Sequence, residues 1–143
     1  MLVQLFSHST GMPTIDARAD FTRARRAARV ARCLSGRWRR PGHPRMLADG
    51  VVRTTRAARV ESIALDAIVG TVELSRHFDE RFRPTSERAR ARWERIALAV
   101  RRGIALPPIA VVHGSDGYYV TDGRHRVSVA RAIGQREIDA WVR

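Results

Sequence analysis

The segment TDGRHRVSVARAIG, residues 121–134, places three side chains capable of positive charge at the expected start of a helix. The turn Asp122–Gly123 is followed directly by Arg124, His125 and Arg126, and then by a short helical pattern that ends at a glycine. The first turn of a helix has unpaired N–H groups and a partial positive charge, so it attracts anions. Arginines oppose that dipole, and such violations of local preference are typical of functional sites. The segment therefore predicts a site for an anion, with phosphate as the best candidate.

Each residue of this turn has an expected role. Gly123 lets the backbone approach a ligand because it has no Cβ. Arg124 and Arg126 supply planar forks of donors that suit phosphate oxygens. Asp122 is expected to cap the helix. His125 is either a donor to the ligand or a hydrogen-bonded structural residue; it has no second His or Cys at helical ligand spacing, so no metal site is expected.

The elements around this turn predict an α+β domain. Their order is strand, helix, hairpin, helix, strand. We expect a strand at 60–65, a helix capped by Ser86 and ended by Gly103, hairpin strands at 109–113 and 118–121 joined by GSDG, a helix at 125–133, and a strand at 138–142. Trp93 lies on the apolar stripe of the first of these helices and is expected in the core.

The N-terminal part differs in charge from the rest. The chain has 27 basic residues other than histidine, all arginine, and a formal net charge of +13. Residues 1–59 hold 13 arginines and 3 acidic residues, whereas residues 60–143 hold 14 arginines and 11 acidic residues. The absence of lysine also fits a GC-rich genome, so the placement of arginine is more informative than its total. We predict a basic arm and linker over 1–59 and a globular domain over 60–143.

A helix is expected in the arm over 14–36, with Thr14 or Asp16 as N-cap and Gly36 as the stop. Its apolar face is narrow and mostly alanine, so we expect it to bury little. That face consists of Phe21, Ala24, Ala28, Ala31 and Leu34. Residues 38–50 read as a connector, since they contain prolines and glycines.

The cysteine content and the apolar stretches of the sequence indicate the compartment in which the protein resides. Cys33 is the only cysteine, so no internal disulfide can form, and it is expected to fill the edge of the arm's apolar stripe. No secretory signal and no apolar stretch of roughly 18 residues is present. We expect a cytoplasmic, bacterial protein with no membrane contact.

The run GIALPPIAVV, followed later by YYVTDGRHRVSVARAIG, resembles the ParB/sulfiredoxin-like domain. That family pairs a Pro-Ile-x-Val segment with a Gly-x-x-Arg box that opens a helix. The stretch RHFDERF, residues 76–82, is similar to a segment that precedes the family's first long helix. The likeness covers residues 60–143.

The resemblance implies a nucleotide site, with CTP or ATP and Mg²⁺ as the expected cofactor. The Gly-x-x-Arg box, Gly123 to Arg126 with Asp122 before it, would face the triphosphate. The segment containing Gly103, Pro108 and Ile109 would face the nucleoside. The chain departs from sulfiredoxin because Arg124 stands where that enzyme has a cysteine. We also expect it to lack the DNA-reading domain that follows this domain in chromosome-partition proteins.

The charge pattern and the family resemblance together predict two alternative functions. The first is a nucleotide-binding module, extending to a slow NTPase or nucleotide-dependent switch, with Glu73 or Asp122 as the candidate base and catalytic residues otherwise unknown. The second is a non-enzymatic protein that binds DNA or RNA without sequence preference through the arginines of residues 16–40. Pairing of the arm with a second chain, as a homodimer, is a further alternative.

Overall fold

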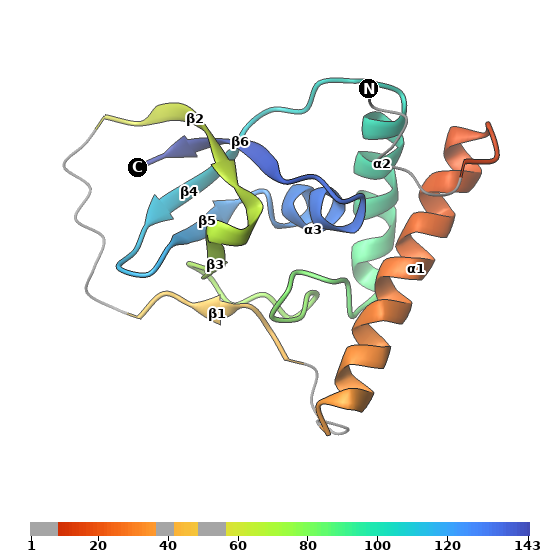
Figure 1. Ribbon diagram of the computed structural model, residues 1–143, viewed down its shortest axis with the longest axis horizontal. Coiled ribbons are helices and arrows are strands. Elements are labelled where there is room, and N and C mark those ends of the chain that lie inside the picture. Colours follow the sequence, from red (N-terminus) through yellow and green to blue (C-terminus); the bar gives the residue numbers. More distant parts are fainter. Residues whose placement is uncertain (1–8, 37–41, 49–56) are drawn as a thin grey trace.

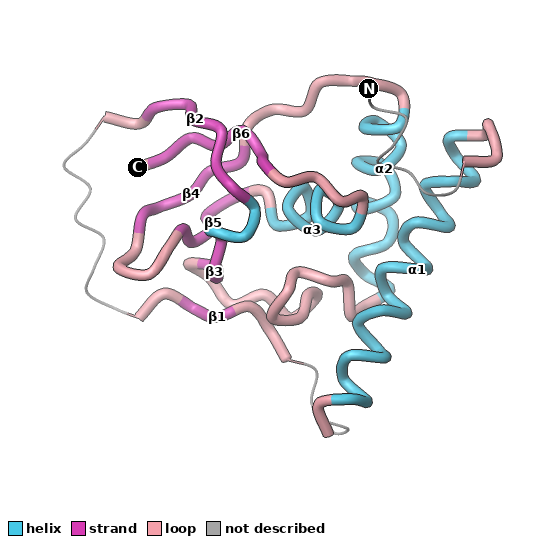
Figure 2. The backbone as a smooth tube through the Cα atoms, in the orientation of Figure 1, coloured by secondary structure: helices cyan, strands magenta, loops and turns pink. Residues whose placement is uncertain are grey.

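The computed structural model describes residues 9–36, 42–48 and 57–143, which form three helices and a mixed sheet (Figures 1 and 2). The α-helices are α1 (Pro13–Leu34), α2 (Arg90–Arg101) and α3 (Arg124–Ala132), and the 3₁₀ turns are η2 (Leu65–Ala67) and η3 (Glu87–Ala89). The strands are β1 (Arg45–Met46), β2 (Arg59–Ala64), β3 (Ile68–Thr71), β4 (Ile109–His113), β5 (Tyr118–Asp122) and β6 (Glu137–Val142). The expected α+β class is confirmed.

The sheet has the order β1-β3-β5-β4-β6-β2. The hairpin β4–β5 is antiparallel and turns at residues 114–117, as the GSDG composition predicts. Strand β6 pairs in parallel with β4 and antiparallel with β2. Helix α3 lies between the sheet and α2, and α1 lies along the outer side of α2 (Figure 1). One buried cluster joins α3 to the sheet, and a second joins the three helices.

Helix α1 begins earlier than its sequence predicts. Met12 is the N-cap and Pro13 holds the first helical position, where its missing N–H costs nothing. The prediction of Thr14 or Asp16 as the cap is wrong. The Asp16 carboxylate instead accepts hydrogen bonds from the backbone N–H and the hydroxyl of Thr10, which ties the preceding turn to the helix. The end was predicted correctly, since Gly36 follows the C-cap with a φ of 67°.

The inner face of α1 belongs to the hydrophobic core, so the expectation that it buries little is wrong. Phe21 is completely buried and meets Trp93 of α2 edge to face, with ring centroids 5.5 Å apart. Ala17 and Ala24 pack beside it because small side chains let the two helices approach closely. The last turn is different, since Leu34 is 84 % exposed.

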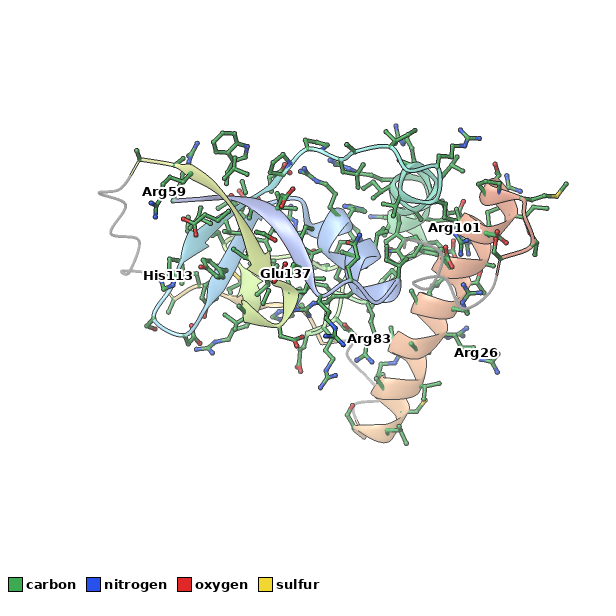
Figure 3. The ribbon with its side chains drawn as sticks, turned by 45° about the horizontal axis from the view of Figure 1, so that its top comes forward. Arg26, Arg59, Arg83, Arg101, His113 and Glu137 are labelled. Carbon is green, nitrogen blue, oxygen red and sulfur yellow. The ribbon has the colours of Figure 1, made fainter. Side chains whose placement is uncertain are left out.

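A buried ion pair fixes the same interface. Arg101 at the end of α2 donates from Nε to Asp20 on α1 at 2.6 Å, and its side chain is 4 % exposed (Figure 3). A buried charge needs such a partner. Cys33 is exposed rather than packed at the edge of the stripe.

Strand β3 and its neighbour β1 were not predicted. Gly70 of β3 lies so close to the Arg45 carbonyl of β1 that a Cβ would overlap it. Strand β1 comes from the stretch expected to be a connector, of which only residues 42–48 are described. Strand β1 consists of two exposed residues and β3 is largely buried, so neither shows the polar–apolar alternation that marks a half-exposed strand.

Candidate anion-binding site

The start of α3 is shaped by Gly123. This glycine is the N-cap with a φ of 103°, and no side chain caps the helix. The expectation that Asp122 is the cap is wrong. The N–H groups of Arg124, His125 and Arg126 therefore begin the helix without a side-chain acceptor.

A side chain at position 123 has no room. A Cβ there would lie 2.5 Å from Cγ2 of Ile109, which is itself completely buried on β4. The positive φ is a second reason for glycine. The close contact between the turn and β4 sets the position of the helix start.

Arg126 holds the turn to the Pro-Pro segment. Its Nη1 donates to the carbonyls of Pro107 at 2.6 Å and Pro108 at 2.8 Å, and its Nη2 donates to Asp122 Oδ2 at 2.7 Å. The side chain is only 12 % exposed. Arg126 is thus mainly a positioning residue, because most of its donors are already engaged.

A cleft of about 420 Å³ opens in front of this helix start. We call it the arginine cleft. It lies between the turn 122–126, the loop 74–78 and one face of η3 and α2. Of the residues that the structure describes, five arginines and a single carboxylate residue line it, namely Arg76, Arg88, Arg92, Arg124, Arg126 and Asp122.

Four of these guanidinium groups are unpaired. In residues 9–36, 42–48 and 57–143, the side chains of Arg76, Arg88, Arg92 and Arg124 have no hydrogen-bond or ion-pair partner. Other arginines of the same region are paired; Arg90, for example, binds Glu87 and Glu94. Like charges gathered without counter-charges repel one another, and a bound anion would relieve that repulsion.

His125 is a neutral group in this setting. Its ring packs edge to face on Phe78, with centroids 4.9 Å apart. Burial, together with the nearby charge of Arg92, lowers the pKa of His125 to about 4. At neutral pH the imidazole therefore adds no charge, although its ring nitrogens can still form hydrogen bonds with a ligand.

The residues expected on the nucleoside side lie apart from the cleft. Gly103 lines a separate cavity of about 300 Å³, which shares only Arg126 with the arginine cleft. Pro108 contributes its carbonyl to Arg126, and Ile109 is buried beneath Gly123. The structure thus brings Asp122, Gly123, Arg124, His125 and Arg126 together and sets Gly103, Pro108 and Ile109 beside or behind them.

The sequence alone does not reveal the arginines that face the turn 122–126 from the other wall of the arginine cleft. Arg88 and Arg92 were predicted to lie on a helix, but the helical pattern alone does not show that their face meets residues 122–126. Their spacing of one helical turn was the available signal, because residues i and i+4 share a face. Arg76 was within the stretch noted for its family resemblance.

Of the carboxylates considered as a catalytic base, one lines the cleft. Asp122 is 67 % exposed and pairs with Arg126, whereas Glu73 is exposed and is not among the residues that line the cleft. Within the described residues, no group of three or more His, Cys, Asp or Glu side chains is arranged to hold a metal ion.

The fold is of the α+β class expected from the sequence. Among solved structures, the chain is similar to sulfiredoxin from Arabidopsis thaliana, with 20 % identity, a TM-score of 0.42, and coverage of 59 % of this chain and 84 % of that one. No protein-family model and no curated protein matches the sequence. None of the described helices is long and apolar enough to span a membrane.

Proposed function

We propose that this protein binds a nucleoside triphosphate, CTP or ATP, with the phosphate chain in the arginine cleft. The observation that carries the proposal is the set of four unpaired guanidinium groups around an uncapped helix start. Guanidinium forks and helix N–H groups are both strong binders of phosphate oxygens. A cleft of about 420 Å³ also falls within the usual size range of small-ligand sites.

The cleft offers donors from two directions. Arg124 and the first N–H groups of α3 would bind the phosphate chain on one side, and Arg88 and Arg92 would bind it from the opposite wall. Gly123 keeps that part of the backbone clear of any side chain. Arg126 and Asp122 would hold the turn in place rather than contact the chain directly.

An apolar part of the wall suits the nucleoside. Leu74, which is 43 % exposed, and Ile96 of α2 line the arginine cleft beside the arginines. Both are aliphatic and neither offers a side-chain donor or acceptor to a base. We therefore expect weak discrimination among bases, with most of the affinity in the phosphate contacts.

The proposal concerns binding rather than turnover. A hydrolase needs a positioned base to activate water. Asp122, the one carboxylate that lines the cleft in the described part of the chain, is held by Arg126. Slow hydrolysis would thus require Asp122 to leave its partner, and phosphate release by Asp122→Asn beside the parent tests that step.

Thermal unfolding with CTP, ATP and GTP tests the binding. A ligand at a hundred times its Kd stabilises the fold by about 2.7 kcal/mol, which raises Tm by several degrees for a domain of this size. Arg124→Ala and Arg92→Ala should lose most of the shift while keeping the Tm of the free protein. Arg95→Ala is the matched control, since Arg95 is exposed on α2 but does not line the cleft. Absence of a shift with all three nucleotides at millimolar concentration would reject the proposal.

A second candidate is nucleic-acid binding through α1. Its outward face carries exposed arginines, of which Arg26 points away from the rest of the molecule (Figure 3). Arg23 and Arg25 are paired with Asp20 and Glu87, and Arg37, Arg39 and Arg40 lie outside the described residues. The free ones in the described part of α1 are Arg18, Arg26, Arg29 and Arg32. Four phosphate contacts predict that log K falls against log salt with a slope of about −3 to −4.

A further inference from the structure

The metal that usually accompanies a nucleoside triphosphate has a poor site in the arginine cleft. Mg²⁺ takes oxygen ligands and is held in proteins by one or two carboxylates together with phosphate oxygens and water. Among the described residues, Asp122 supplies the one carboxylate that lines the cleft. The other titratable groups with lone pairs are the imidazoles of His77 and His125, and Mg²⁺ does not favour nitrogen ligands.

The carboxylate of Asp122 is also already used. Its Oδ2 accepts from Arg126 Nη2 at 2.7 Å, and Arg126 is anchored on the other side by the carbonyls of Pro107 and Pro108. Arg124 lies on the same turn. A dication next to Asp122 would therefore compete with one guanidinium and be repelled by another.

The arginines can supply the charge that a metal would otherwise provide. A triphosphate chain with an ionised terminal phosphate carries about four negative charges near neutral pH. The cleft has four unpaired guanidinium groups, those of Arg76, Arg88, Arg92 and Arg124. The four positive charges of these guanidinium groups thus balance the roughly four negative charges of the metal-free triphosphate. Coordinated Mg²⁺ would cancel about half of the ligand's charge and occupy oxygens that the guanidinium groups would bind.

We propose, on the basis of the nucleotide-binding function above, that the arginine cleft selects the metal-free triphosphate and that Mg²⁺ weakens binding. This departs from the CTP or ATP with Mg²⁺ expected from the family resemblance. The chain's own arginines would take the place of the cation in neutralising the phosphate chain.

Calorimetric titration of the full chain with ATP and CTP tests this. One buffer contains EDTA and the other contains MgCl₂ in excess over nucleotide, with ionic strength matched by NaCl. We expect Kd to be lower in EDTA by roughly tenfold, the effect of one lost charge-assisted hydrogen bond. Equal or tighter binding in Mg²⁺ overturns the selection for the metal-free form but leaves the proposed function standing. Binding in neither buffer overturns both.

Alanine variants show whether the arginines of the cleft are responsible for the preference for the metal-free nucleotide. Arg92→Ala should weaken binding of the free nucleotide roughly tenfold and that of the magnesium complex by less, so that the ratio of the two Kd values narrows. Arg95→Ala, on the same helix but outside the cleft, should keep the ratio of the parent. An unchanged ratio in Arg92→Ala, with the parent's Tm, would contradict charge neutralisation by the cleft.

Discussion

Phe21 of α1 packs edge to face against Trp93 of α2, with ring centroids 5.5 Å apart and both side chains completely buried. The Trp93 indole N–H in turn donates to Ser128 Oγ of α3 at 2.8 Å. The three helices are thus connected through one aromatic pair and one buried hydrogen bond. Since α2 and α3 both line the arginine cleft, α1 supports the site without contacting it.

Replacing Phe21 by alanine should destabilise the protein strongly. Loss of a fully buried phenylalanine costs about 3–5 kcal/mol, because the surrounding side chains fill the cavity only in part. Leu34→Ala on the same helix is the control, since Leu34 is 84 % exposed and its replacement should change stability by less than about 0.5 kcal/mol. Urea unfolding measures both.

Removal of residues 1–36 should have an even larger effect. It would expose Trp93 and the apolar face of α2 to water, and it would remove Asp20, which binds Arg101 in this interface. We expect a chain that no longer unfolds cooperatively, in contrast to the independent domain expected from the sequence. A sharp transition in the truncated chain at the parent's Tm would show that α1 is a dispensable arm.

Gly123→Ala should cost more stability than Gly134→Ala. Both glycines have positive φ, 103° and 79°, so alanine at either position would have a strained backbone. A Cβ at 134 would meet no atom within 4 Å, whereas one at 123 would collide with Ile109. The collision adds about 1–3 kcal/mol. Equal Tm values for the two variants would mean that the turn moves freely away from β4.

Alanine variants of Arg126 and Arg124 should separate an effect on unfolding free energy from an effect on nucleotide affinity. Arg126→Ala removes three hydrogen bonds and leaves the carbonyls of Pro107 and Pro108 without their donor, so we expect a loss of about 1–3 kcal/mol in unfolding free energy. Arg124→Ala should leave the unfolding free energy unchanged and reduce nucleotide affinity. Urea unfolding without ligand distinguishes the two effects; equal stabilities would contradict the positioning role of Arg126.

His125 should make the fold acid-sensitive between pH 6.5 and 4. Its pKa is about 4 in the folded protein and near 6.5 in the unfolded chain, so the unfolded state binds the proton first as the pH falls. Stability due to the neutral imidazole is complete above pH 6.5 and decreases as the pH falls toward 4. The difference in unfolding free energy between the parent and His125→Gln, followed over this range, measures the effect. A constant difference would place the His125 pKa near its ordinary value.

The sequence predicts the hairpin, α2, α3 and β6 well because their signals are local. The GSDG turn, the Ser86 cap, and the glycines at 103 and 134 each act within a few residues. Strands β1 and β3 depend on a close approach between Gly70 and Arg45, and no local pattern encodes a contact between segments so far apart in the chain.

The sequence indicates one side of the arginine cleft but not the other. The dipole violation at Arg124 and Arg126 marks the turn, but the sequence does not distinguish the two arginines. The structure does, because only Arg126 reaches the carbonyls of the Pro-Pro segment. Arg88 and Arg92 complete the cleft through the packing of α2 on α3, which depends on Trp93 and Ser128 rather than on any motif.

Backbone amide chemical shifts of the ¹⁵N-labelled protein during titration with ATP or CTP give the most direct test of nucleotide binding in the arginine cleft. The account predicts saturable changes that are largest for Arg124, His125 and Arg126, with further changes around Arg92 and Arg76 and none at Leu34. Loss of these changes in Arg124→Ala, but not in Arg95→Ala, would agree with it. Changes confined to α1 or to the cavity beside Gly103, or no changes at millimolar nucleotide, would contradict it.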